Sequence, residues 1–182
     1  MDKEMTVDGK EYTIIKLLGH GKGGYSYLVS FHGGHAVLKQ IHHEPCDYYT
    51  FGNKLEAEKH DYIRLKEAGI RIPRMIAVEE STERIVKEYI DGPTIFDLVR
   101  DGLPADPYLP QVREMARQAG AAGLNIDYFP TNFVVQDGLI WYVDYECNDY
   151  MEKWNFENWG IRYWFYTPEF EAYLRQKERE EV

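Results

Sequence analysis

A glycine-rich run, Gly19-His-Gly-Lys-Gly-Gly-Tyr25, separates two stretches that predict β-strands. Glycine lets backbone N–H groups approach a polyphosphate closely, which makes Gly19, Gly21, Gly23, Gly24 and Tyr25 candidate phosphate contacts. An ordinary hairpin turn would have the same composition. Two registers fit, one being Gly19-x-Gly21-x-x-Gly24 and the other starting at Gly21 and placing Tyr25 at the loop tip. A strand follows the run, so it predicts neither a Rossmann fingerprint nor a P-loop.

Three oxygen-bearing side chains form a second candidate group. The segment Leu124-Asn-Ile-Asp-Tyr-Phe-Pro-Thr-Asn-Phe-Val-Val135 carries Asp127 and Asn132 in D-x-x-x-x-N spacing. Asp144 follows seventeen residues after Asp127 (144 − 127 = 17), at the end of an apolar run. Carboxylate and amide oxygens suit Mg²⁺, although an aspartate after an apolar run is more often a turn former.

The elements that position these residues change type halfway along the chain. Alternating apolar patterns predict strands over residues 12–18, 25–29, 35–41, 75–78 and 84–90, which would form a five-stranded antiparallel sheet. A turn at Gly33-Gly34 and a helix over residues 53–67 interrupt them.

The second half predicts mainly helices. They span residues 95–100, 108–123, 155–165 and 168–180, with Thr94 as N-cap of the first. Residues 133–135 and 139–143 predict a hairpin across Asp137-Gly138.

The strand Ala36-Val-Leu-Lys39 resembles the Val-Ala-Ile-Lys strand of protein kinases, which supplies a phosphate-binding lysine. Glu58 lies nineteen residues after Lys39 (58 − 39 = 19), where a kinase-like helix would offer an ion-pair partner for that lysine. Glu56 is the rival, and Glu58 could instead be a helix-surface residue. With Ala68-Gly-Ile70 and Pro73 downstream, the pattern looks like the small atypical kinase of the KEOPS complex.

The segment Val86-Lys-Glu-Tyr-Ile-Asp-Gly92 looks like a kinase hinge. The resemblance implies that the backbone of Glu88 and Ile90 meets the adenine edge, while apolar side chains such as Val37 sandwich the ring. Lys87 stands where kinases place an apolar gatekeeper, which is a departure from the family pattern.

The segment around Asp127 resembles the catalytic loop of protein kinases, RIO-like kinases and aminoglycoside phosphotransferases. The resemblance implies that Asp127 addresses the acceptor hydroxyl, while Asn132 and Asp144 bind Mg²⁺. Two departures affect chemistry, because Asn125 replaces a His or Tyr and Phe129 replaces a cation. Asn155-Phe-Glu-Asn-Trp-Gly160 echoes, with asparagine for aspartate, a helix that anchors the catalytic loop in kinases.

These resemblances imply an α+β, two-lobed protein-kinase-like fold: a lobe of residues 1–90, a hinge at 91–93 and a reduced, mainly helical lobe of 94–182. They imply an ATP- and Mg²⁺-dependent phosphotransferase, similar to serine/threonine protein kinases, with Lys39, Glu58 and Asp127 as catalytic residues. A small-molecule phosphotransferase and a catalytically inactive nucleotide-binding scaffold remain alternatives. The acceptor is not identified, and a protein partner could complete the small second lobe.

Composition limits the expected binding partners and cellular location of the protein. The formal net charge of −10 and a pI near 5.1 argue against broad binding of nucleic acid. The chain has two cysteines and no apolar run near the ~20 residues that span a bilayer, so we expect a cytoplasmic protein. We expect solvated loop residues rather than a metal site at His42, His43 and Cys46.

Overall fold

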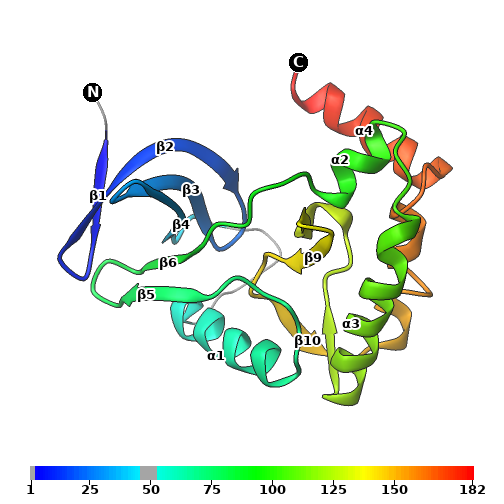
Figure 1. Ribbon diagram of the computed structural model, residues 1–182, viewed down its shortest axis with the longest axis horizontal. Coiled ribbons are helices and arrows are strands. Elements are labelled where there is room, and N and C mark those ends of the chain that lie inside the picture. Colours follow the sequence, from blue (N-terminus) through cyan, green and yellow to red (C-terminus); the bar gives the residue numbers. More distant parts are fainter. Residues whose placement is uncertain (1–2, 46–52) are drawn as a thin grey trace. The chain divides into compact units, whose positions relative to one another are not determined.

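Strands dominate the first part of the chain and helices the second in the computed structural model, which describes residues 3–45 and 53–182 (Figure 1). The fold is α+β, as the sequence predicts, and it contains a curved antiparallel sheet. The chain divides into two compact units, Met1–Tyr62 with Pro73–Tyr89 and Ile63–Ile72 with Ile90–Val182. Cys46 lies outside the described residues.

The sheet of the first unit has six strands in the order β1-β2-β3-β4-β6-β5, whereas the sequence predicted five. Their bounds are β1 Glu4–Val7, β2 Lys10–His20, β3 Gly24–Phe31, β4 Gly34–Ile41, β5 Met75–Glu79 and β6 Arg84–Glu88. The missed strand is β1, which pairs with β2 across Asp8-Gly9. Both turn residues have positive φ, 50° and 75°, the geometry for which Asp-Gly is a strong hairpin signal.

Apolar residues that alternate along the strands form the core of the first unit. Its buried residues are Val7, Tyr12, Val29, Ala36, Leu38 and Val86. Helix α1 spans Lys54–Glu67 and contributes Leu55 to a smaller cluster with Ile41 and Ile85. This contact packs the start of α1 against strands β4 and β6.

The second unit combines three further α-helices with two short sheets. The helices are α2 Ile95–Arg100, α3 Leu109–Ala121 and α4 Pro168–Glu180, and the strands are β7 Leu124–Ile126, β8 Phe133–Gln136, β9 Leu139–Tyr142 and β10 Cys147–Asp149. Short 3₁₀ helices are η1 Asp106–Tyr108, η2 Pro130–Asn132, η3 Glu152–Trp154 and η4 Gly160–Tyr163. Thr94 forms the predicted N-cap, and the hairpin turns at Asp137 and Gly138.

In the second unit the sequence analysis missed one strand pair and made one wrong helix prediction. The antiparallel pair β7 and β10 was not predicted, because three-residue strands carry too little periodicity. Residues 155–165 do not form an α-helix. The Asn155 side chain accepts the backbone N–H of Asn158 at 2.8 Å, as at a helix N-terminus, but the chain continues through turns into the 3₁₀ helix η4.

Aromatic rings fill the core of the second unit, in keeping with the aromatic content of the sequence. Trp164 is fully buried, and its ring lies 5.1 Å from that of Phe133 and 5.4 Å from that of Phe156. Both contacts are edge-to-face, an arrangement that aromatic pairs favour. The segment that failed to form an α-helix therefore supplies the central ring of this core.

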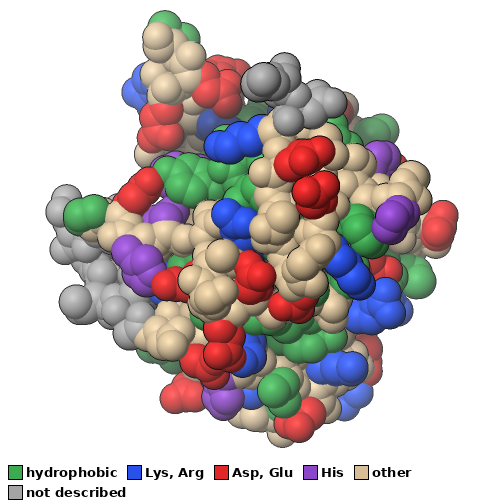
Figure 2. Space-filling view, turned by 90° about the vertical axis from the view of Figure 1, so that its left-hand side faces the viewer, with side chains coloured by type: hydrophobic (Ala, Val, Ile, Leu, Met, Phe, Trp, Pro, Cys, Tyr) green, Lys and Arg blue, Asp and Glu red, His purple; other side chains and the backbone are tan. Residues whose placement is uncertain are grey.

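Acidic and basic side chains are interspersed across the face drawn in Figure 2. Within the described part of the chain, none of the helices has both the length and the apolar character that crossing a bilayer requires.

Candidate functional site

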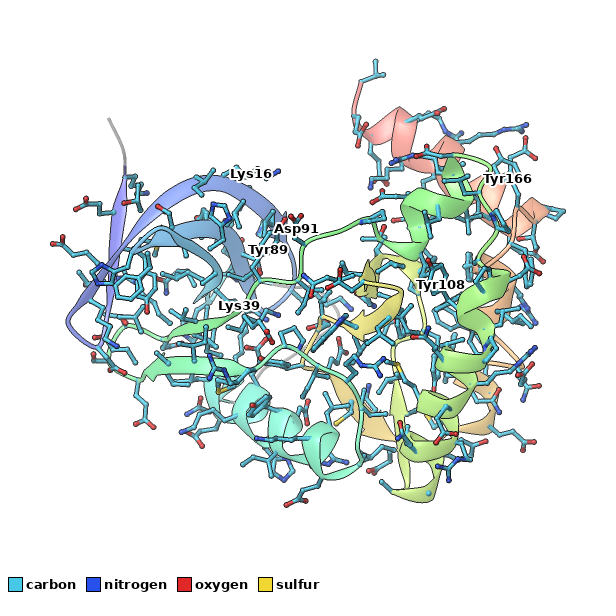
Figure 3. All side chains as sticks on the ribbon, in the orientation of Figure 1. Lys16, Lys39, Tyr89, Asp91, Tyr108 and Tyr166 are labelled. Carbon is cyan, nitrogen blue, oxygen red and sulfur yellow. The ribbon has the colours of Figure 1, made fainter. Side chains whose placement is uncertain are left out.

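Lys39 forms an ion pair with Glu58 within the first unit. Strand β4 supplies the lysine and α1 the glutamate, and their side chains are 17% and 14% exposed. Lys16 on β2, by contrast, is exposed and points away from the sheet (Figure 3). Among the described residues the second carboxylate oxygen of Glu58, Oε2, is buried without a hydrogen-bond partner. The Glu58 carboxylate therefore lies in a partly buried polar environment.

The rival glutamate faces elsewhere. Glu56 is 56% exposed at its side chain and pairs with Lys59 at 3.1 Å, on the same helix. The pairing of Lys39 with Glu58 therefore follows from the helical positions, which place Glu56 toward solvent. Val37 lies two residues before Lys39 on β4 and is buried.

The glycines between β2 and β3 differ in whether the structure leaves room for a side chain at their positions. A Cβ at Gly24 would lie 2.4 Å from the Gln40 carbonyl oxygen, so the strand pairing itself excludes a side chain there. A Cβ at Gly23 would lie 3.4 Å from Nζ of Lys39, which places this turn beside the ammonium. At Gly19 and Gly21 a Cβ would meet nothing within 4 Å. The open space at these two positions is compatible with the approach of a ligand.

Residues 21–23, here called the glycine-rich turn, connect β2 to β3. The backbone N–H of Gly21 donates to the carbonyl of Gly24 at 3.0 Å. Tyr25 is not at the tip, as one register predicted, but lies in β3 opposite His20. The turn is therefore shorter than that register requires.

Two residues that sequence reasoning missed hold this turn through its carbonyl groups. His42 contacts the Gly21 carbonyl through Nε2 at 2.8 Å, and its backbone N–H donates to the Gly23 carbonyl. Lys54 is 7% exposed and donates from Nζ to the Lys22 carbonyl at 3.1 Å. His42 is thus not the solvated loop residue that the sequence predicted. The available signal for Lys54 was its spacing of one helical turn before Glu58.

The hinge-like residues fall in different units. Glu88 ends β6 in the first unit, where its backbone N–H donates to the Arg74 carbonyl at 2.9 Å. Ile90 belongs to the second unit and is buried. Gly92 is required there, because a Cβ would lie 1.8 Å from the Val135 carbonyl oxygen. Adenine recognition by Glu88 and Ile90 stays a prediction.

In the second unit, hairpin register brings the two predicted metal ligands to the same end of a sheet. Asn132 immediately precedes β8, and Asp144 comes two residues after β9. The backbone N–H of Val143 donates to the Asn132 carbonyl at 2.9 Å, which ties the two strand ends together. Nδ2 of Asn132 donates to the Asp127 carbonyl at 3.3 Å, so its side-chain oxygen is the atom it offers a cation.

Asp127 directly follows β7 and starts a tight turn. Its Oδ1 accepts the backbone N–H of Phe129 at 3.0 Å. The backbone N–H of Asp127 donates to the Tyr142 hydroxyl at 3.2 Å, and this hydroxyl donates to the Glu146 carbonyl at 2.8 Å. Burial raises the pKa of Tyr142 well above its ordinary value, with the Asp144 charge adding to the effect. The neutral phenol thereby fixes the backbone around Asp127.

Phe129, for which the kinase resemblance implies a cation, packs into the aromatic core. Its ring lies 4.7 Å from Tyr173, 5.1 Å from Tyr163 and 6.3 Å from Phe96. The side chain of residue 129 therefore contributes to core packing and supplies no positive charge.

The anchoring of this loop differs from the prediction made for Asn155. The side chain of that asparagine bonds to Tyr150 and to the backbone N–H of Asn158. Instead the Trp164 indole N–H donates to the Tyr128 carbonyl at 2.8 Å. Gly160 packs against the same residue, because a Cβ there would lie 2.5 Å from Cβ of Tyr128. A packed aromatic segment thus replaces the expected polar anchor.

No protein-family model matches the chain. Over 86 residues it is 30% identical to the KEOPS complex subunit Bud32 of Pyrococcus abyssi. The match covers 45% of this chain and 39% of that protein, so the chain spans well under two thirds of that relative's length. The similarity supports a partial relationship to kinase-like proteins. The RIO-like and aminoglycoside phosphotransferase resemblances stay predictions.

Proposed function

We propose that this chain is an ATP-dependent phosphotransferase with a two-lobed protein-kinase-like fold. Residues 1–90 and 94–182 would be the lobes and 91–93 the hinge. The Lys39–Glu58 ion pair beside Gly23 carries the proposal. A lysine oriented by a partly buried glutamate next to a glycine-rich turn suits the binding of nucleotide phosphates. The partial similarity to Bud32 supports the same class.

The second unit would supply the groups for transfer. Asn132 and Asp144 offer the hard oxygen ligands that Mg²⁺ prefers, so the donor set fits this ion. Bound Mg²⁺ would neutralise charge on the phosphates of ATP. Asp127 would orient the acceptor hydroxyl and take up its proton. The bonds of Asp127 to Phe129 and Tyr142 would hold the carboxylate in place for this role.

The acceptor would be a hydroxyl group, either a serine or threonine of a protein or an alcohol of a small molecule. The partial relative, Bud32, is a subunit of the KEOPS complex. We therefore include a protein partner for the second unit in the proposal, with the cytoplasm as the expected location.

The second candidate function is a nucleotide-binding scaffold without phosphotransferase activity. The aromatic packing of Phe129 favours it, since a missing cation would remove a stabiliser of the transferring phosphoryl group. Both functions share the nucleotide site and differ only in turnover.

Thermal unfolding and labelled ATP separate these possibilities. Millimolar Mg-ATP should raise the melting temperature, because a ligand bound only by the folded state stabilises it. Asp144→Asn should remove the Mg²⁺-dependent part of this shift. Asp127→Asn should reduce phosphate transfer roughly a hundredfold with little change in ATP affinity. No shift with Mg-ATP would contradict the nucleotide site, and binding without turnover would select the scaffold.

A further inference from the structure

Three metal-ligating side chains gather beside the glycine-rich turn. His20 is the last residue of β2, His42 follows β4 directly, and Glu44 lies two residues further along. Their ligand atoms all lie within 4.8 Å of one another. We propose that His20, His42 and Glu44 form a binding site for a transition-metal dication of the Zn²⁺ class. The site is independent of the Mg²⁺ ligands proposed in the second unit.

The spacing suits a zinc ion with small side-chain adjustments. Zinc bonds of about 2.1 Å in tetrahedral geometry separate ligand atoms by about 3.4 Å. Oε2 of Glu44 lies 3.0 Å from Nε2 of His20 and 3.8 Å from Nε2 of His42, so the two distances bracket that value. Three protein ligands leave the fourth position to water or another donor.

The ligand types select the metal. Two imidazoles with one carboxylate suit Zn²⁺, Ni²⁺ or Cu²⁺, whereas Mg²⁺ prefers an all-oxygen set. Zn²⁺ is therefore the probe of choice, and Mg²⁺ is the comparison that should fail.

Tyr25 supports two of the three ligands from β3. Its hydroxyl donates to Oε1 of Glu44, which leaves Oε2 directed to the histidines. The His20 ring stacks on the Tyr25 ring at 4.2 Å. Such outer partners orient metal ligands and tune affinity.

Metal binding would change how the glycine-rich turn is held. In the structure Nε2 of His42 contacts the Gly21 carbonyl, and its Nδ1 accepts the backbone N–H of Glu44 at 3.3 Å. A nitrogen that ligates a metal cannot also donate a hydrogen bond. The ring proton must therefore move to Nδ1 by exchange with water, which displaces the Glu44 contact and releases the Gly21 carbonyl. The site thus links metal occupancy to the turn.

Calorimetric titration of chelator-treated, full-length protein with ZnCl₂ tests the site without any nucleotide. We expect one equivalent of Zn²⁺ to bind and MgCl₂ to give no saturable signal. His20→Ala, His42→Ala and Glu44→Gln should each weaken Zn²⁺ binding at least tenfold, and Tyr25→Phe about tenfold. Circular dichroism of each variant establishes that it is folded, and Glu44→Gln preserves side-chain shape.

His43→Ala is the matched control. His43 is adjacent in sequence, but its side chain is 66% exposed and pairs with Glu83 at 2.7 Å, outside the cluster. Unchanged Zn²⁺ affinity in His43→Ala supports the assignment, whereas an equal loss there overturns it. Absence of Zn²⁺ binding to wild-type protein, or full binding by Glu44→Gln, also overturns it. The proposed nucleotide site is tested separately, by the shift in melting temperature with Mg-ATP.

Discussion

The two units hold their candidate residues by different physical means. In the first unit, Lys39 and Glu58 form a partly exposed ion pair, and side chains from outside the glycine-rich turn bind its carbonyls. In the second unit, residues 127–132 are held by backbone hydrogen bonds and by the fully buried Trp164. One arrangement relies on polar contacts and the other on core packing.

The difference predicts which substitutions affect stability. Burying a charged pair costs desolvation that offsets much of its Coulomb attraction, so the polar contacts of the first unit should add little net stability. Removing a large aromatic side chain from a core costs its transfer free energy together with a cavity term. Substitutions at the candidate residues of the first unit should therefore change function with less loss of stability than substitutions in the aromatic core of the second unit.

Trp164→Ala should have the largest effect on the free energy of unfolding. We expect a loss of about 3–5 kcal/mol, measured by urea denaturation, because the variant leaves a large cavity and unpairs the Tyr128 carbonyl. Trp154→Ala is the matched control, since Trp154 is 41% exposed, and it should cost far less. Similar losses for the two variants would end the claim that core packing holds residues 127–132.

Much of the architecture followed from local pattern. The positions of α2 and α4 match the predicted ranges, because Thr94 and Pro168 mark helix starts unambiguously. The β8–β9 hairpin followed from Asp137-Gly138. Such signals lie within a few residues of the structure they specify.

The rest depended on contacts distant in sequence. Lys54 bonds to a carbonyl thirty-two residues away and Trp164 to one thirty-six residues away. The helical spacing of Lys54 before Glu58 indicates a shared helix face, but nothing in the sequence specifies the distant carbonyl that either side chain binds. The same limit hid the His20, His42 and Glu44 cluster, since strand pairing of β2 with β3 and of β3 with β4 brings its members together.

Gly24→Ala should have the second largest effect. Its methyl group would overlap the Gln40 carbonyl within the β3–β4 pair, so we expect a loss of about 1–3 kcal/mol in unfolding free energy. Gly21→Ala is the control, because a Cβ there meets nothing within 4 Å. Gly21→Ala should unfold like wild type yet weaken Mg-ATP binding, if a ligand uses that open space. Equal destabilisation by both would show that the glycine-rich turn is as tightly packed as the strands.

Tyr142→Phe should cost somewhat less, about 1–2 kcal/mol, because it leaves the Asp127 N–H and the Glu146 carbonyl without their shared partner. Faster amide exchange at Asp127 should accompany the loss. Tyr150→Phe removes an exposed hydroxyl that accepts a bond from Asn155, and it should leave amide exchange at Asp127 unchanged. An unaltered exchange rate in Tyr142→Phe would remove the phenol from the support of Asp127.

Lys54→Met should have the smallest effect on stability and the clearest effect on the glycine-rich turn. Methionine keeps the buried aliphatic volume while removing the ammonium that binds the Lys22 carbonyl, and relief of charge desolvation offsets the lost hydrogen bonds. We expect a change below about 1 kcal/mol in unfolding free energy, with faster amide exchange at residues 21–23 and weaker Mg-ATP binding.

Lys59→Met is the control on the same helix, because the Lys59 ammonium pairs instead with Glu56 and Glu80 near the surface. If Lys54→Met destabilised the protein by as much as Trp164→Ala, the first unit would depend on a buried polar anchor as strongly as the second depends on its aromatic core. If turn exchange were equal in Lys54→Met and Lys59→Met, Lys54 would only fill space. We expect faster amide exchange in the glycine-rich turn and a nearly unchanged free energy of unfolding for Lys54→Met. That result would mean that the Lys54 contact positions the turn but adds little to the stability of the first unit.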